Sequence, residues 1–278
     1  MLFIGKYNNL TIARHTSVGL FLEDVQGEEV LLPNRYVTED MKIDDEITVF
    51  VYNDSEDRPV ATTEKPYIVR NEFAYLEVKE VNEQGAFLDW GLLKDLFVPF
   101  REQPERMREG EKYIVFLYLD HQTNRLIASA KINKYVDNER LLVEENDEVD
   151  LLVWERTDLG YNVIVNQYHK GLVYHNEIFK NISVGDRLKG YVKKIREENK
   201  LDISLEKLGV EKFEPLSQRI LDTLKAQGGF LPLHDGSSPE AISAELEMSK
   251  KNFKKTIGNL YKKGIINLEE NGIRLVKP

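Results

Sequence analysis

The 278-residue chain contains no cysteine, and its 38 basic and 48 acidic side chains give a net charge of −10. The missing cysteines exclude disulfides, thiolate zinc sites and a cysteine nucleophile, and they are typical of a reducing cytoplasm. The amino terminus has no basic segment before a long apolar core, and no apolar run approaches the ~20 residues that span a bilayer. We therefore expect a cytoplasmic protein with no membrane partner and with two to four small domains.

An internal repeat organises most of the chain. Shifting the sequence by 66 residues places Phe87 on Phe21 and Pro99 on Pro33 without a gap. A third copy follows 141 to 142 residues beyond the first, with Val163 on Phe21 at the cost of one deleted residue. Small domains that are copied in this way are more often binding modules than enzymes.

Each copy carries signals for five short strands. An alternating first strand leads to two short apolar strands, and a turn containing Gly or Asp then precedes two longer alternating strands. The longer strands are predicted over 46–52 with 60–63, 112–119 with 126–130, and 187–195 with 201–205. Five short strands in roughly 65 residues fit a closed or nearly closed antiparallel barrel, which hides its strand edges. The acidic turn at 54–57 is interpreted as a solvent-exposed hairpin tip.

The third copy carries the most specific motif. Gly-Leu-Val-Tyr-His-Asn-Glu-Ile at 171–178 is followed by Val-Gly-Asp at 184–186 and Leu-Asp-Ile-Ser-Leu at 201–205. This pattern is similar to that of the S1 RNA-binding domain, although Val163 and Asp202 depart from the usual Phe and Arg. The second copy, over 85–91 and 97–99, resembles the S1 variant found in endoribonucleases. The resemblance implies OB-fold barrels that bind RNA.

The apolar period changes from two to 3.6 after a linker predicted from Glu206 to Pro215. Helices are expected over 215–227, over 239–248 with Ser238 as N-cap, and over 250–263 with Ser249 as N-cap. The last segment predicts a hairpin with an Asn271-Gly272 turn. Three helices and a terminal hairpin resemble a winged helix.

Three S1-like units and this tail resemble the conserved virulence factor B family of bacterial RNA-binding regulators over nearly the whole chain. The fold is therefore expected to be mainly β with a C-terminal α+β domain, as three tandem S1-like OB-fold barrels followed by a winged helix. The expected domains are 1–65, 66–140, 141–212 and 213–278. The resemblance also implies post-transcriptional regulation, related to virulence if the source is a pathogen.

Charge is distributed unevenly along the chain. Residues 1–66 carry 13 acidic and 6 basic side chains, whereas residues 213–278 carry 8 acidic and 10 basic ones. Because Lys and Arg supply most of the non-specific affinity for phosphates, RNA contacts are expected more in the later units than in the first.

Outward side chains of strands two and three stack on bases in S1-like folds, and an aromatic ring suits that role. By this resemblance the candidate residues of the first two copies are Phe21, Arg35, Phe87, Trp90, Phe97 and Phe100. The alternative for these rings is packing within a barrel or between domains. On the fourth strand of the second copy, Ile114, Phe116 and Tyr118 share an apolar face that predicts a contact surface for a neighbouring domain or a second chain.

In the third copy, strand alternation places four residues with basic and aromatic side chains on one face. Together with neighbouring rings, the candidates here are Tyr161, Tyr174, His175, Arg187, Lys189, Tyr191 and Lys193. The alternative is a solvated strand whose lysine stems cover apolar surface.

In the winged helix the candidates are Lys250, Lys251, Lys254, Lys255, Lys262 and Arg274. Arg or Asn is missing at base-reading positions, which favours backbone contact or protein docking over DNA readout.

No catalytic constellation is present in the sequence. The five histidines are scattered, and there is no His-Glu-x-x-His, phosphate-binding glycine loop or Gly-x-Ser-x-Gly segment. We expect no catalytic residue, no metal and no cofactor. The sequence predicts a protein that binds single-stranded RNA through several weak, linked modules. The alternatives are a protein-interaction scaffold, with ribosomal or other proteins as partners, and a DNA-binding regulator acting through the winged helix.

Overall fold

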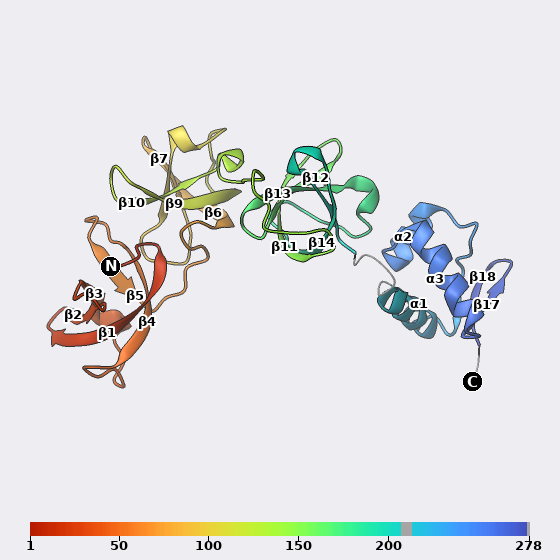
Figure 1. Cartoon of the computed structure of the whole chain (residues 1–278), viewed down its shortest axis with the longest axis horizontal. Helices are drawn as coiled ribbons and strands as arrows, with labels where there is room; N and C mark the ends of the chain where they lie inside the picture. Colours follow the sequence, from red (N-terminus) through yellow and green to blue (C-terminus); the bar gives the residue numbers. More distant parts are fainter. Residues whose placement is uncertain (207–212, 277–278) are drawn as a thin grey trace. The chain divides into compact units, whose positions relative to one another are not determined.

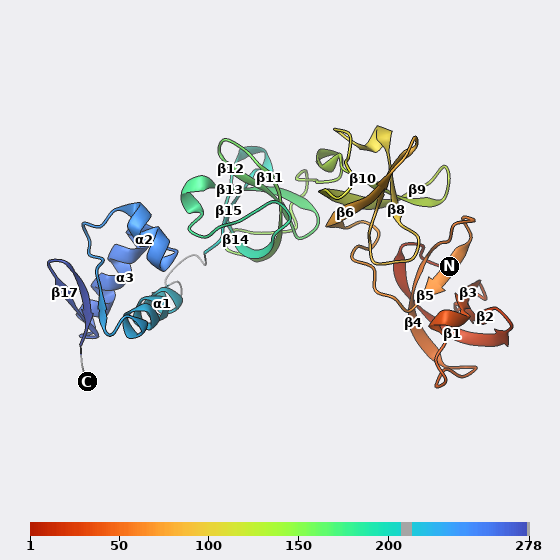
Figure 2. The same ribbon diagram turned by 180° about the vertical axis from the view of Figure 1, so that it is seen from behind.

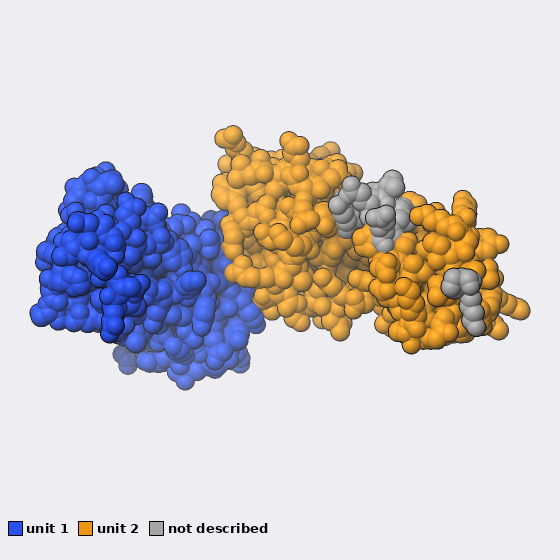
Figure 3. All heavy atoms as spheres, turned by 90° about the horizontal axis from the view of Figure 1, so that it is seen from below, with its two compact units in different colours: residues 1–136 blue, residues 137–278 orange. Residues whose placement is uncertain are grey.

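The computed structural model describes residues 1–206 and 213–276. It confirms a mainly β chain that ends in an α+β domain (Figure 1). The chain divides into two compact units, residues 1–136 and 137–278, which are coloured separately in Figure 3. Most of the linker predicted from Glu206 to Pro215 lies outside the described residues.

The first unit begins with a closed barrel in the strand order β1-β2-β3-β5-β4. Its strands are β1 (Lys6–Thr16), β2 (Gly19–Glu23), β3 (Glu29–Pro33), β4 (Glu46–Asn53) and β5 (Pro59–Thr62), with the 3₁₀ helix η1 (Asn34–Tyr36) between β3 and β4. Figure 2 shows these strands from behind. Leu20 and Leu22 enter the core of the barrel, while Phe21 between them is half-buried on the outside.

The sequence predicts an antiparallel barrel, but one pair of strands is parallel, namely β3 with β5. An odd number of strands in a closed ring cannot alternate in direction at every pair. One parallel pair is therefore unavoidable in a five-stranded barrel, and it joins the two strands that close the ring.

The five strands of the second barrel follow one another along the chain as in the first barrel, but they form an open sheet in the order β10-β9-β6-β7-β8. Its elements are β6 (Phe73–Val81), β7 (Gly85–Leu88), β8 (Leu96–Pro99), η2 (Phe100–Glu102), β9 (Lys112–Asp120), β10 (Arg125–Ser129) and η3 (Ile132–Lys134). One hydrophobic core contains Phe50, Tyr52 and Val60 of the first barrel together with the inner residues of the second. The first two barrels therefore pack as one body.

The second unit opens with a closed barrel ordered β11-β12-β13-β15-β14, again with a parallel closing pair. Its elements are β11 (Glu148–Arg156), β12 (Gly160–Val165), β13 (His169–Tyr174), η4 (His175–Glu177), β14 (Arg187–Ile195), η5 (Glu197–Asn199) and β15 (Leu201–Ser204).

The pairing of second and third strands corrects the alignment of the third copy. In every barrel a glycine that starts the second strand faces the end of the third strand, in the pairs Gly19–Pro33, Gly85–Pro99 and Gly160–Tyr174. This register places Asn162, not Val163, at the position of Phe21. Val163 is fully buried. The predicted deletion between these two strands is wrong, because the first four strands of the third copy match those of the first at a constant offset of 141 residues.

Gly160→Ala is expected to destabilise the third barrel by about 1–3 kcal/mol, as other overpacked sites do. A Cβ at this position would lie 1.9 Å from the carbonyl oxygen of Val173. The matched control is Gly258→Ala within a helix, where an added Cβ meets nothing within 4 Å. Hydrogen exchange should quicken over 148–204 in the first variant only. Equal exchange in the two variants would contradict the close approach.

The winged helix contains α1 (Phe213–Ala226), β16 (Phe230–Leu231), α2 (Pro239–Leu246), α3 (Lys250–Lys262), β17 (Ile266–Glu269) and β18 (Gly272–Leu275). The predicted N-caps are confirmed, since Ser238 accepts from Ala241 N and Ser249 accepts from Asn252 N. The two-residue strand β16 was not predicted, and it joins the hairpin in the order β16-β18-β17. Among the described helices, none combines the length and apolar character needed to cross a lipid bilayer.

The terminal turn is one residue away from its predicted place. Glu269 pairs with Gly272, so the turn consists of Glu270 and Asn271. Gly272 has a different role, because a Cβ there would lie 2.4 Å from the carbonyl oxygen of Leu231. The glycine allows β16 to approach β18.

Candidate nucleic-acid interface

Two aromatic rings lie side by side on the outer face of the second barrel. Phe87 on β7 is the cross-strand partner of Phe97 on β8, and their ring centroids are 5.1 Å apart at an interplanar angle of 34°. Both side chains are half-buried, whereas Ala86, Leu88 and Val98 beside them are fully buried. Strand alternation thus turns both rings outward. We call this pair the Phe87–Phe97 platform.

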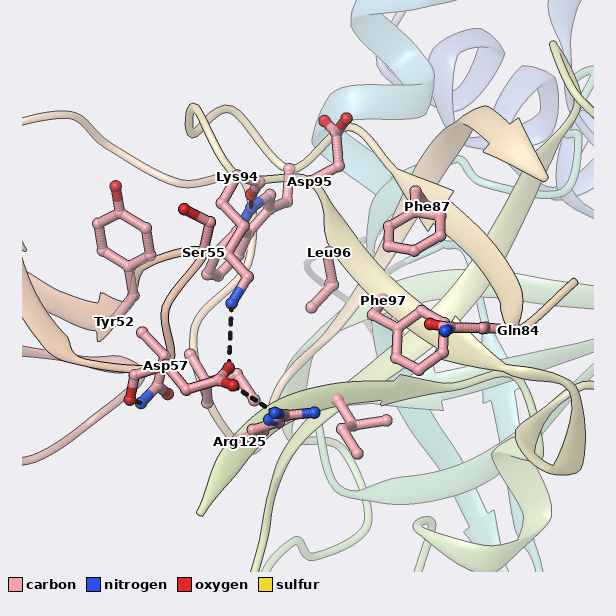
Figure 4. A pocket seen from close by; sticks show the side chains of 14 residues that line it. Tyr52, Ser55, Asp57, Gln84, Phe87, Lys94, Asp95, Leu96, Phe97 and Arg125 are labelled. Atoms are coloured by element: carbon pink, nitrogen blue, oxygen red, sulfur yellow. Dashed lines mark hydrogen bonds and ion pairs between the residues drawn. The ribbon is translucent and has the colours of Figure 1, made fainter. Parts of the chain in front are cut away.

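The platform borders a cleft of about 240 Å³, seen from close by in Figure 4. One wall comes from the second barrel and includes Gln84, Lys94 and Arg125. The opposite wall is the β4–β5 hairpin of the first barrel, with Tyr52 and Asp57. The cleft therefore exists only because the two barrels pack together.

Opposite charges meet in this cleft. Asp57 pairs with Lys94, at 3.5 Å between Oδ1 and Nζ, and also with the guanidinium of Arg125. Lys94 Nζ also donates a hydrogen bond to the carbonyl oxygen of Asp54 at 2.5 Å. Dashed lines in Figure 4 join Asp57 to both cations.

Trp90 does not belong to the platform, contrary to its prediction as an RNA-stacking residue. Its side chain is only 2% exposed and packs edge-on against Phe50 and Tyr52 of the first barrel, with centroids 5.9 and 6.1 Å away. Its Nε1 donates to the carbonyl oxygen of Lys94 at 2.5 Å. Burial in the same cluster raises the pKa of Tyr52 to about 12. Trp90 therefore joins the barrels and leaves no ring face for a base.

Other predicted rings are covered on one face by an arginine. The Cζ of Arg14 lies 3.9 Å from the centroid of Phe21, and that of Arg106 lies 3.4 Å from the centroid of Phe100. Two hydrogen bonds from Arg14 to Glu29, at 3.1 and 2.6 Å, raise the pKa of Arg14 and lower that of Glu29. A base would have to displace these guanidinium groups.

Two predictions for the first two copies remain, the arginine Arg35 and the apolar face on β9. Arg35 is exposed, with its Cζ 5.0 Å from the centroid of Tyr36. The apolar face predicted on β9 as a contact for a neighbouring domain or a second chain is covered instead by the second copy's own C-terminal segment. There Phe116 stacks on Tyr135 with centroids 4.3 Å apart, so the segment after η3 covers the face.

The predicted basic stripe of the third barrel lies on one outer face, but both of its lysines are paired with acids. Arg187, Lys189 and Lys193 are exposed, and Tyr191 is half-buried. Lys189 pairs with Asp150 at 2.8 Å, which raises the pKa of Lys189. Lys193 pairs with Glu177 at 2.5 Å, and Tyr191 donates to Glu148 at 3.0 Å. Phosphates would have to compete with these carboxylates.

The third barrel presents different side chains at the platform position. Asn162 and Leu172 face each other there, and Asn162 Nδ2 donates to Glu155 at 2.9 Å. The predicted aromatics lie nearby. Tyr161 is edge-on to His175 at 5.8 Å, and Tyr174 has the Cζ of Arg196 6.0 Å from its centroid.

The winged helix presents its lysines on α3, the second helix of the α2–α3 pair. Lys250 donates to the carbonyl oxygen of Gly236 at 3.4 Å, and Lys254 lies 3.9 Å from Asp235. Lys251, Lys255 and Lys262 are exposed. Arg274 on β18 makes two hydrogen bonds to Glu269 and lies 4.7 Å from the centroid of Phe230. It is already engaged within the hairpin.

Residues 4–64 and 72–131 match the S1 domain family, and residues 218–275 match the CvfB-like winged helix domain. Conserved virulence factor B of Staphylococcus epidermidis is 29% identical over 284 residues, which cover 99% of this chain and 95% of that protein. The uncharacterized protein YitL of Bacillus subtilis is 29% identical over 277 residues, covering 96% and 92% respectively.

Among solved structures, a multidomain protein with nucleic acid binding domains from Streptococcus pneumoniae aligns over 98% of both chains, with 24% identity and a TM-score of 0.44.

The barrels and the matched domains define a nucleic-acid-binding protein with tandem S1 domains and a C-terminal winged helix. The third barrel shares the strand order of the first although it lies outside the matched residues. The chain is similar to conserved virulence factor B over nearly the full length of both proteins, and its residues 218–275 match the CvfB-like winged helix domain.

Proposed function

We propose that this protein binds single-stranded RNA, with its principal contact at the Phe87–Phe97 platform, and regulates gene expression in the cytoplasm at the RNA level. The observation that carries the proposal is this pair of outward-facing rings beside a cleft that contains Lys94 and Arg125. Stacking on an aromatic ring contributes about 1–3 kcal/mol per base and accepts every base, because each has a π-face.

The other units act as weaker contacts in this proposal. An arginine covers the ring of Phe21 and that of Phe100, and Lys189 and Lys193 of the third barrel are paired with acids. Linked weak sites still add affinity, because binding at one raises the effective concentration of RNA at the next. A role in virulence-related expression is part of the proposal, supported by the name of the staphylococcal relatives.

Crosslinking tests the location of the site. The full chain is irradiated with a single-stranded RNA that contains 4-thiouridine, and crosslinked peptides are identified by mass spectrometry. We expect the main crosslinks in the 85–99 segment. Crosslinks confined to the first barrel or to the winged helix would contradict the proposal.

The lysines of α3 favour an additional, sequence-independent contact with the phosphate backbone. Replacing Lys250, Lys251, Lys254 and Lys255 by Gln should make log K less dependent on log salt, by up to about 3 in slope, since each phosphate contact on a single strand contributes ~0.7. Lys225→Gln, an exposed lysine on α1, is the control. A slope unchanged by the fourfold replacement would remove α3 from the RNA interface.

A further inference from the structure

The two cations beside the platform are held by an acid from the neighbouring barrel. Lys94 precedes β8 and Arg125 begins β10, so both belong to the second barrel, whereas Asp57 lies at the tip of the β4–β5 hairpin of the first. All three line the same cleft as Phe87 and Phe97 (Figure 4). A strand with one base on the platform would bring its backbone phosphates close to these cations.

We propose that Lys94 and Arg125 form a phosphate subsite for the RNA strand bound at the platform, and that the Asp57 carboxylate occupies this subsite until RNA displaces it. The inference rests on the proposed RNA binding. A carboxylate and a phosphate present similar pairs of anionic oxygens to a guanidinium, which binds both through its planar fork of N–H donors. Asp57 therefore holds the place of a phosphate in the free protein.

The magnitudes allow the exchange. The side chains of Lys94, Asp57 and Arg125 are 37%, 35% and 55% exposed, so water reaches all three. Ion pairs exposed to this degree contribute about 0.2–1 kcal/mol each, far less than buried ones. Breaking both pairs thus costs an amount of the same order as the gain from stacking one base, or less.

The hairpin tip can release Asp57 without unfolding. Its turn is held by Asp54, whose carboxylate accepts from Glu56 N at 2.9 Å and from Arg58 N at 3.0 Å and also pairs with Arg58 at 2.8 Å. The side chain of Asp57 is not part of that network. Its backbone has φ 62°, a left-handed conformation that Asn tolerates as well as Asp. Asp57→Asn consequently removes the charge and keeps the turn.

The test measures binding of a fluorescein-labelled single-stranded RNA of about 12 nucleotides, within the ~4–16 nucleotides of one OB fold, to full-length variants. Asp57→Asn should tighten binding by about 2- to 30-fold, which is the loss of two exposed ion pairs expressed as an affinity. Arg125→Gln should weaken binding. Affinity changes of opposite sign in these two variants indicate that Asp57 competes with RNA for Arg125. If the Asp57–Arg125 ion pair only joined the two barrels, either substitution would break it and both would change the affinity in the same direction.

Glu56→Gln is the matched control. It removes the same charge from the neighbouring position of the same hairpin, but Glu56 pairs with Arg58 and not with the cleft. If Asp57→Asn tightens binding no more than Glu56→Gln, or if both Asp57→Asn and Arg125→Gln weaken it, the masked subsite is overturned. If the subsite fails this test while alanine at Phe87 and Phe97 still weakens binding, the platform stands, so the two proposals fail separately.

Discussion

Replacing both Phe87 and Phe97 by alanine is expected to weaken the binding of single-stranded RNA by at least about tenfold. Each ring that stacks on a base contributes about 1–3 kcal/mol, and 1.4 kcal/mol corresponds to a factor of ten. Both side chains are half-buried on the outside of the barrel, so their removal should leave the core intact. Fluorescence anisotropy of a labelled RNA gives the dissociation constant, and circular dichroism checks the fold.

The control for this double variant lies at the equivalent positions of the first barrel, Phe21 and Leu31, which face each other in the same register. Because the guanidinium of Arg14 covers the ring of Phe21, alanine at these two positions should change affinity much less. Equal losses in the two double variants would show that the platform has no special part in binding.

Trp90→Ala is expected to have the largest effect on stability, a loss of about 3–5 kcal/mol, as other large core truncations do. The indole is 2% exposed, contacts Phe50 and Tyr52 across the boundary between the first two barrels, and donates to the Lys94 carbonyl oxygen. Its removal leaves a cavity in the shared core. Hydrogen exchange should therefore quicken on both sides of the boundary, over residues 1–64 as well as 67–131.

Trp154→Ala is the comparison, since it truncates the other tryptophan of the chain. Trp154 is half-buried on β11, with Lys170 Nζ 4.8 Å from its ring, so a smaller loss confined to the third barrel is expected. If Trp90→Ala left exchange in the first barrel unchanged, the tryptophan would not couple the two barrels.

The barrel repeat and the winged helix could be predicted because their signals are local. Alternation, turn glycines and N-cap serines each act within a few residues. The parallel closing pair and the strand β16 depend instead on pairing between distant segments. The register of the third copy differs from the predicted one because Val163 resembles Phe21 in polarity, although its neighbour Asn162 occupies the outward position.

The platform rings could be proposed from the sequence, but the environment of each ring could not. Nothing near Trp90 in the chain indicates that the first barrel buries it. The acidic turn at 54–57 predicts only a solvent-exposed tip, yet Asp57 reaches two cations of the next barrel. Lys94 and Arg125 were not among the predicted residues, since the cleft is assembled from three separate segments and no local motif marks them.

Binding of the full chain to single-stranded RNA, duplex RNA and single-stranded DNA of matched length, measured by fluorescence anisotropy at two salt concentrations, tests the central claim most directly. Stacking predicts tighter binding to single strands than to a duplex, whose bases are already stacked, and phosphate contact predicts weaker binding at high salt. RNA specificity predicts a preference for single-stranded RNA over the matched DNA. Binding that favoured duplex RNA, or no binding to any of the three, would contradict the account and direct attention to protein partners.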